Sequence, residues 1–550
     1  MSWIQNYDPF GNIGLSAVVA AVPLLIFLYM LGVRRAKGHL AAMVSLVCAV
    51  VLAIVGWKMP VGLAISATLN GAAFGLFPIV WIIIPSIWVY HMTVESGQFE
   101  VIKNSLASIT DDRRLQALFI AFAFSSFLEG TAGYGTPVAI TSAMLVGLGF
   151  NPVYAAGICL IANTAPVAFG GIGIPIVVSA QVTGIDPMEI SKVVGRQLPL
   201  LGLIVPMWIV VIMCGWKRAM EVLPAVLVTG ILFSSTIFLV SNYVNPYLPD
   251  IIAAIVTIVG LLIFLKVWRP KTIWLFPGET PSAGRVKLEY SAGEVCRAWA
   301  PYLILAVLVF LWADDKYTNF KAMLIQIDKT LPFLVYSWPG LDGLVIKTTP
   351  VVLVDTPYAA KYMFNLFSAA GTAIFVSGLL ALAVIPNYSA GRAASCFVRT
   401  TKILIFPITT ISMILGLAYI MNYSGMSSTL GLGFTGTGAL FPFFSPVLGW
   451  LGVFLTGSDT SSDALFCSMQ KTAAQQLNID PTLTVAANST GGVCGKMISP
   501  QSISVATAAT GQVGEEGTIF RFTILHSLAM LAIISVLTYL QAYSLHWMLP

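Results

Sequence analysis

Long apolar runs are the feature that most constrains this chain. A helix needs about 20 apolar residues to cross the roughly 30 Å of hydrocarbon in a bilayer. Runs of this kind recur along the 550 residues, clearly at 13–32, 40–57, 74–90, 198–214, 223–240, 251–268, 302–312, 403–421 and 524–545. Only 9% of the residues are charged, whereas an average soluble domain has about 25%. The sequence therefore predicts an all-α polytopic membrane protein with roughly 12–14 transmembrane segments.

Basic residues indicate how the chain crosses the membrane, because Lys and Arg collect in cytoplasmic loops. Lys37 follows the first span, Lys103 follows the third, and a basic loop covers 266–300. We expect these segments inside and the mixed-charge segment 314–361 outside. The net charge of +5 is carried by such loops, so the expected partner is the lipid bilayer and not a nucleic acid.

The start of the chain and the cysteines suggest no further chemistry. MSWIQNYDPFGN has neither a basic n-region nor a small-residue cleavage site, so we expect the first apolar run to be retained as a helix. The seven cysteines are scattered without a C-x-x-C pair. They are expected to be packing residues rather than disulfides or metal ligands. No cofactor is predicted.

Several polar motifs occur twice, which is typical of transporters built from two halves. FLEGTAGYGTP at 127–137 matches FLTGSDTSSDA at 454–464. Further matches join 150–166 to 479–492, 173–184 to 498–511, and VESGQF at 94–99 to NYSGMS at 422–427. Basic residues follow the helix before Ser96 but precede the helix before Ser424, so the two helices are expected to cross in opposite directions. The repeat is therefore predicted to be inverted.

This repeat divides the chain into five predicted parts. They are N-terminal transmembrane helices at 1–95, a first repeat with a hairpin and a broken helix at 96–265, a cytoplasmic basic loop at 266–300, linking helices and an external loop at 301–401, and a second repeat with a hairpin, a broken helix and a C-terminal helix at 402–550.

Each half contains two polar, glycine-rich interruptions. In lipid, irregular backbone survives only where protein or a water-filled cavity satisfies its polar groups. We expect 127–137 and 454–464 to be tips of re-entrant hairpins, and NTAPVAFGGIGIP and NSTGGVCGKMISP to be unwound helix centres. Interrupted helices direct N–H groups into the gap, which suits a small carboxylate. The candidate substrate-binding residues are Asn163, Thr164, Gly170, Ser458, Thr460, Asn488, Ser489, Thr490 and Lys496.

Three carboxylates lie in these interruptions, where an unpaired charge is costly. Asp459 and Glu129 are the candidates for proton coupling, because a buried carboxylate can take up a proton as an anion binds nearby. Lys496 is expected to pair with Asp459 or to meet the substrate. Simpler roles compete with these: Glu129 and Asp463 could reach an interface or cap a hairpin, Asp459 could be a helix N-cap, and Lys496 a structural counter-ion. The glycines could serve close helix packing instead of breaks.

The motifs resemble those of a known family. NYDPFGN, GRQLP, FLEGTAGYGTPVAITSAMLVGLGF, NTAPVAFG, GWLGVFLTGSDTSS, TGGVCGKMISPQSI and the closing LQAY look like the bacterial L-lactate permease family, from the first residues to the last. The resemblance implies proton symport of lactate and often glycolate, the cytoplasmic membrane of a bacterium, the inverted-repeat fold of the ion-transporter superfamily and an elevator-like movement. This chain has Asp463 where the family pattern often has Asn.

The resulting prediction is proton-coupled uptake of L-lactate and related small 2-hydroxy monocarboxylates such as D-lactate and glycolate. Two other classes stay open at this stage. Asp459 and Asp463 share one helical face, as an intramembrane Mg-dependent enzyme of prenyl diphosphates would require, although the matched stretch supplies only Glu129. A passive anion channel is the third reading. The sequence leaves open whether the protein forms a homodimer.

Overall fold

The computed structural model describes residues 2–34, 36–133, 135–276, 290–313, 319–330 and 335–550. Nine helical segments in these ranges are long and apolar enough to cross a membrane, and one bent pair of helices makes up to ten. This count is below the predicted 12–14 because most hairpin helices are short and because the segment Pro187–Tyr243 holds two helices. The predicted all-α polytopic architecture is confirmed. Arg285 and Lys287 of the predicted basic loop lie outside the described residues.

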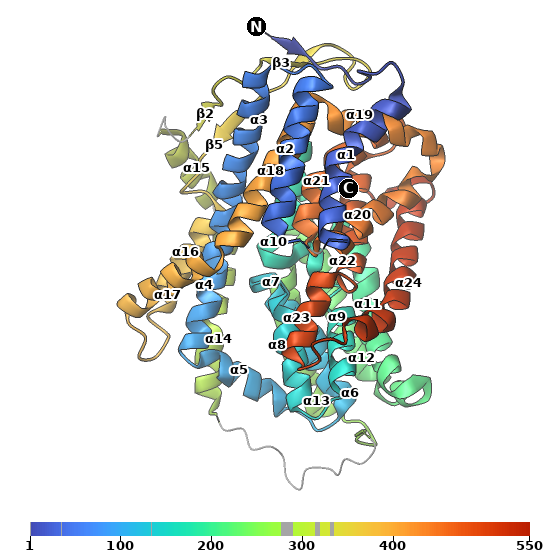
Figure 1. The fold of residues 1–550 in the computed structure, drawn as a ribbon. Coiled ribbons are helices and arrows are strands. Elements are labelled where there is room, and N and C mark those ends of the chain that lie inside the picture. The colour runs from blue at the N-terminus through green and yellow to red at the C-terminus, as the bar shows by residue number, and fades with distance from the viewer. Residues whose placement is uncertain (1, 35, 134, 277–289, 314–318, 331–334) are drawn as a thin grey trace.

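Four long helices pack side by side in the upper half of Figure 1. They are α1 (Ile13–Gly32), α2 (Gly38–Val55), α3 (Val61–Phe74) and α18 (Ile405–Ser424). Glycine allows the closest of these contacts, because a methyl group at Gly71 would overlap the backbone carbonyl of Leu415. Val18 on α1 and Val47 on α2 are exposed, as expected of side chains that face lipid.

Two helical hairpins occupy the positions of the matched motifs. The first joins α7 (Ser125–Thr131) to α8 (Thr136–Gly147), and the second joins α20 (Phe441–Thr456) to α21 (Asp459–Gln476). Ser458 caps α21, because its side chain accepts the N–H of Ser461. The predicted N-cap role of Asp459 is therefore wrong, and Asp459 is the first residue of the helix.

Each hairpin is followed by a helix that breaks. In the first half, α9 (Pro152–Ala162) leads through η3 (Val167–Phe169) to α10 (Gly170–Thr183), with a bend of 66°. In the second half, α22 (Pro481–Lys496) ends shortly before α23 (Pro500–Ala509). Both breaks lie next to a hairpin carboxylate, as the candidate site requires.

The second break is shorter than the sequence predicts. Residues 488–495 were expected to be unwound, but they form the last turns of α22. Their glycines serve packing, because methyl groups at Gly491 and Gly495 would overlap the carbonyls of Pro446 and Trp450 on α20. Close packing through small residues is common between helices in membranes.

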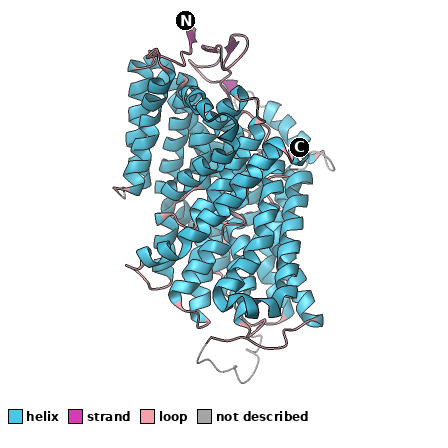
Figure 2. Cartoon of the chain, turned by 90° about the vertical axis from the view of Figure 1, so that its right-hand side faces the viewer, coloured by secondary structure: helices cyan, strands magenta, loops and turns pink. Residues whose placement is uncertain are grey.

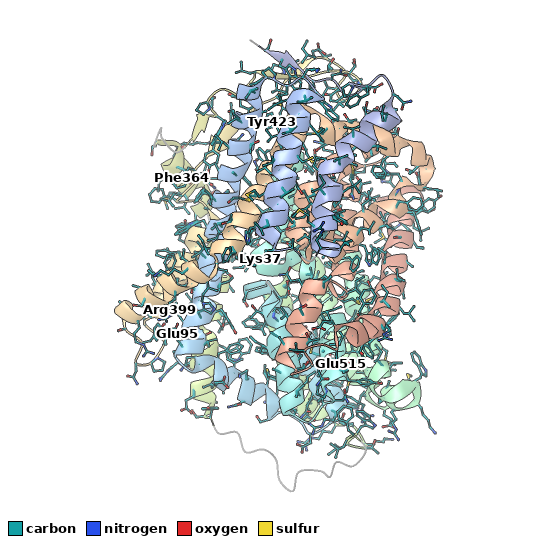
Figure 3. All side chains as sticks on the ribbon, viewed as in Figure 1. Lys37, Glu95, Phe364, Arg399, Tyr423 and Glu515 are labelled. Carbon is teal, nitrogen blue, oxygen red and sulfur yellow. The ribbon has the colours of Figure 1, made fainter. Side chains whose placement is uncertain are left out.

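The equivalent junctions of the two halves lie toward opposite ends of the molecule (Figure 3). Gly97 joins α4 (Trp81–Glu95) to α5 (Gln98–Ala107) with φ +75°, and Gly425 joins α18 to α19 (Met426–Phe434) with φ +89°. A glycine in the left-handed conformation thus follows each of the two equivalent helices, α4 and α18. Figure 3 shows Glu95, beside the first junction, and Tyr423, beside the second, toward opposite ends of the molecule. This placement agrees with the predicted inversion.

Further helices complete the molecule, and most of them lie in the lower half of Figure 1 or along its left and right edges. In chain order they are η1 (Gly75–Val80), α6 (Arg113–Gln116), η2 (Ala117–Phe124), α11 (Pro187–Ala219), η4 (Met220–Val222), α12 (Leu223–Tyr243), α13 (Pro249–Val267), α14 (Ala292–Ala313), α15 (Phe320–Thr330), α16 (Ala370–Ala381), α17 (Ala390–Ile403), η5 (Thr435–Leu440), α24 (Glu516–Tyr543) and η6 (His546–Met548). The predicted division into five parts stays a prediction.

Short strands cap one end of the molecule, close to the N-terminus (Figure 2). They are β1 (Trp3–Ile4), β2 (Val335–Ser337), β3 (Val345–Lys347), β4 (Thr356–Pro357) and β5 (Lys361–Met363). β1 runs parallel to β3, β4 is antiparallel to β3, and β2 is antiparallel to β5. Burial lowers the pKa of Lys347 to about 8, with a smaller contribution from Lys471. Gln476, the last residue of α21, donates a hydrogen bond to the backbone carbonyl of Pro350 at 2.8 Å, so the cap covers this end of α21.

Cysteine labelling tests the inverted topology. Glu100→Cys, on α5 beyond Gly97, is expected to react with a membrane-impermeant maleimide only after cells are permeabilised. Leu353→Cys, in the cap and 96% exposed, is expected to react in intact cells. Both substitutions are made in a Cys296→Ser background, because Cys296 is itself exposed. Labelling of both positions from the same side would contradict the inversion.

Candidate functional site

A cavity of about 930 Å³ lies between the two hairpins and the two broken helices. One end is lined by the loop at 36–39 and by the start of α24. Lys37 is exposed at this end and lies near mid-height in Figure 3. Because the charge pattern assigns the loop after the first span to the cytoplasm, we interpret the cavity as facing inward.

An ion pair joins the two halves at the cavity wall. Nζ of Lys496, at the end of α22, lies 2.7 Å from Oε1 of Glu129, on α7. The second carboxylate oxygen, Oε2, accepts a hydrogen bond from Nδ2 of Asn163 at 3.0 Å. Both charged side chains are buried, so each depends on its partner to offset the loss of water. The predicted pairing of Lys496 with Asp459 is replaced by this pair.

Gly170 allows Glu129 to reach its position. A methyl group at Gly170 would lie only 2.6 Å from Oε1 of Glu129, which is closer than real side chains approach. The first residue of α10 must therefore be small where the hairpin carboxylate passes it. The same arrangement recurs in the second half, where a methyl group at Gly492 would overlap Oδ1 of Asp459.

Among the described residues, Asp459 has no hydrogen-bond partner, unlike Glu129. Its side chain is 4% exposed and lines the cavity, but neither carboxylate oxygen accepts a hydrogen bond from any described residue. Lys496 and Glu129 line the same cavity as Asp459, and Asp463 follows it by about one turn of α21. A buried carboxylate without a donor is costly as an anion. The site thus contains one paired and one unpaired acid, one from each hairpin.

Asp463 is fully buried behind Asp459. Oδ1 accepts Nδ2 of Asn488 at 2.8 Å, and Oγ of Ser489 lies 3.0 Å from Oδ1 and 2.9 Å from Oδ2. Asn488 also accepts a bond from Gln470. Both carboxylate oxygens of Asp463 thus accept hydrogen bonds from neutral donors. Asp463 is therefore not placed to share a ligand with Asp459.

The predicted site residues fall into two groups. Those that line the cavity are Gly170, Ser458, Thr460 and Lys496, together with Glu129 and Asp459. Those buried behind its wall are Asn163, Thr164, Asn488, Ser489 and Thr490. Within the second group, Asn163, Asn488 and Ser489 bond to carboxylates, and Thr490 donates to Oε1 of Gln197. The Asn-Thr/Ser motifs thus support the acids of the site.

The sequence reasoning missed Asp250, in the first turn of α13. A methyl group at Gly130 would lie 2.8 Å from Cβ of Asp250, which places this carboxylate against the residue after Glu129. The available signal was a carboxylate at the start of an apolar run, YLPDIIAA. Acids are common at helix starts, so this pattern does not distinguish a functional carboxylate from an ordinary one.

Comparison with known proteins identifies the family. The family model described as L-lactate permease matches residues 16–545. The chain is 50% identical over 557 residues to an L-lactate permease of Salmonella typhimurium, which covers 100% of both chains. It is also 50% identical over 555 residues to the glycolate permease GlcA of Escherichia coli, covering 99% of this chain and 98% of that one.

A solved structure shares the fold at low identity. The transporter MtrF of Neisseria gonorrhoeae, described as one of a class of antimetabolite efflux pumps, matches with a TM-score of 0.51 and 11% identity over 94% of this chain and 97% of that chain. The relatives are permeases, so the reading as a prenyl-diphosphate enzyme is wrong and the protein is not an enzyme. It is a multi-pass protein of the bacterial inner membrane, and the chain belongs to the L-lactate permease family.

Proposed function

We propose that this protein takes up L-lactate together with protons, and that it also carries D-lactate and glycolate. The observation that carries the proposal is the Glu129–Lys496 pair beside the unpartnered Asp459 in one buried cavity. The names of the curated relatives support lactate and glycolate as substrates.

Lys496 is the proposed ligand of the substrate carboxylate. Among the described residues, the lysines that line the cavity are the exposed Lys37 and the buried Lys496, and Lys496 lies at the break between α22 and α23. A charged hydrogen bond to a carboxylate is stronger than a neutral one, so an entering 2-hydroxy acid competes with Glu129 for the ammonium group. The hydroxyl groups of Ser458 and Thr460, which line the cavity at the start of α21, are the proposed ligands of the remaining polar atoms of the substrate.

Proton coupling follows from the charges. An anion that binds Lys496 leaves Glu129 without its cation, and Asp459 already lacks a partner. Several negative charges in a cavity of low dielectric repel one another strongly, so each substrate anion is expected to enter together with one proton. Asp459 is the proposed carrier, because it faces the cavity and has no competing hydrogen bond among the described residues. Substrate and proton then cross as a neutral pair.

Removal of the Lys496 charge is expected to weaken lactate binding. Loss of a hydrogen bond to a charged group costs about 1.5–3 kcal/mol, so Lys496→Gln should bind lactate roughly 10- to 100-fold more weakly. Isothermal titration of the purified protein measures this. The single change leaves the Glu129 carboxylate buried without its cation, and the double variant Glu129→Gln with Lys496→Gln removes this charge as well. A loss of affinity that remains in the double variant is therefore due to the missing ligand and not to an unpaired buried charge. Lys192→Gln, in a surface pair, is the control. Parental affinity in the double variant would exclude Lys496 as the ligand.

Asp459→Asn is expected to uncouple transport from protons. The amide keeps the size of the side chain but cannot ionise. In proteoliposomes, the variant should exchange labelled lactate across the membrane and fail to accumulate it when a pH gradient is imposed. Glu129→Gln is the competing candidate and is measured in parallel. If Asp459→Asn accumulates lactate as the parent does while Glu129→Gln does not, Glu129 is the carrier.

Two threonines provide a matched test of the cavity wall. Thr460→Val removes a hydroxyl that lines the cavity, and its KM for lactate should rise roughly tenfold because a bond to a charged ligand is lost. Thr490→Val removes a hydroxyl that donates to Gln197 outside the cavity, so it should lower thermal stability with little change in KM. Equal effects on KM would mean that Thr460 does not contact the substrate.

A further inference from the structure

Asp250 is a buried acid for which neither the fold nor the proposed transport cycle gives a role. Its side chain is 1% exposed, and neither carboxylate oxygen has a hydrogen-bond partner among the residues that the structure describes. An acid in the first turn of a helix ordinarily accepts backbone N–H groups. Here that arrangement is not formed, so helix capping does not account for Asp250.

Among the described residues around Asp250, the nearby cation is Lys496, which is already paired. Helix α13 packs against α12, α7 and η2. From α7 comes Glu129; η2 contributes no titratable group; α12 contributes Tyr243, which is 62% exposed; and the loop before α13 contributes Tyr247. Lys496, from α22, reaches the same hairpin, where its ammonium group lies 2.7 Å from Glu129, the residue before Gly130.

The single positive charge therefore cannot neutralise both acids. Glu129 has Lys496 and Asn163 as donors, whereas Asp250 has none in the described part of the chain. A buried carboxylate in that position is far more stable with a proton than without one. Gly130 allows Asp250 to pack directly against the hairpin, because a methyl group at Gly130 would collide with Cβ of Asp250.

We propose that Asp250 is a second proton-binding site, and that loss of its proton weakens the hold of Lys496 on the anionic substrate. The proposal rests on the function proposed above. An ionised Asp250 adds a negative charge to the field at Lys496, where it competes with the substrate carboxylate. A neutral Asp250 leaves Lys496 to Glu129 and the substrate alone. The site therefore regulates affinity from behind the hairpin, without lining the cavity.

Infrared spectroscopy tests the bound proton without any substrate. The parent at neutral pH is expected to show the carbonyl-stretch band of a protonated carboxylic acid, and Asp250→Asn should lose part of that band. Asp328→Asn is the matched control, because Asp328 is also buried but its oxygens accept the N–H groups of Phe367 and Ser368. It should lose no such band. An unchanged band in Asp250→Asn would overturn the proposal; if that variant does not insert, Asp250→Ala serves the same test.

The pH dependence of lactate binding tests the consequence. The affinity of Asp250→Asn for lactate is expected to equal that of the parent at about pH 6. At about pH 9 the variant is expected to bind lactate about tenfold more tightly than the parent, because its amide stays neutral. A change in affinity that is equal at both pH values would show a structural role only and overturn the regulatory part. Failure of the parent itself to bind lactate would contradict the proposed function, while the infrared result would still decide whether Asp250 carries a proton.

Discussion

The ion pair between Lys496 and Glu129 is the interaction on which the rest of the site depends. It joins residues 367 positions apart in the chain and is the place where the second broken helix meets the first hairpin. Two buried charges are tolerated only when their geometry compensates for the lost water. Asn163 donates a hydrogen bond to the second carboxylate oxygen of Glu129, and Gly170 leaves the space that this carboxylate needs. The conformation of both breaks is thus tied to one contact.

The two hairpins solve the same packing problem with different electrostatic results. In each half, a glycine of the broken helix faces a carboxylate of the hairpin, Gly170 with Glu129 and Gly492 with Asp459. The first carboxylate receives a cation and the second does not. Internal repeats give similar backbones, but their side chains differ, so the two halves have different electrostatic roles. One half holds a charge in place, and the other keeps an acid free to change its state.

The sequence was sufficient for the helical membrane fold, the positions of the hairpins and the family, because apolar length and repeated polar motifs are local signals, but it overestimated the number of spans. Gly97 and Gly425 fall at equivalent left-handed junctions, as the alignment requires. The partner of Lys496 was mispredicted because a contact between the halves leaves no spacing signal. Residues 488–495 were expected to unwind because glycines for close packing and glycines for a break look alike in a sequence. Asp250 was missed because its burial depends on Gly130, more than one hundred positions earlier.

The cap has a consequence for biosynthesis. β1 pairs with β3 through Trp3 and Val345, and the side chain of Gln5 donates to the backbone carbonyls of Asn422 and Tyr423, the latter 418 positions later in the chain. At a synthesis rate of about 5–20 residues per second, the first strand waits roughly 20–80 s for these partners. The N-terminus must stay exposed beyond the membrane during that time. A fusion partner attached there is expected to hinder the pairing of β1 with β3 and so to slow the assembly of the cap.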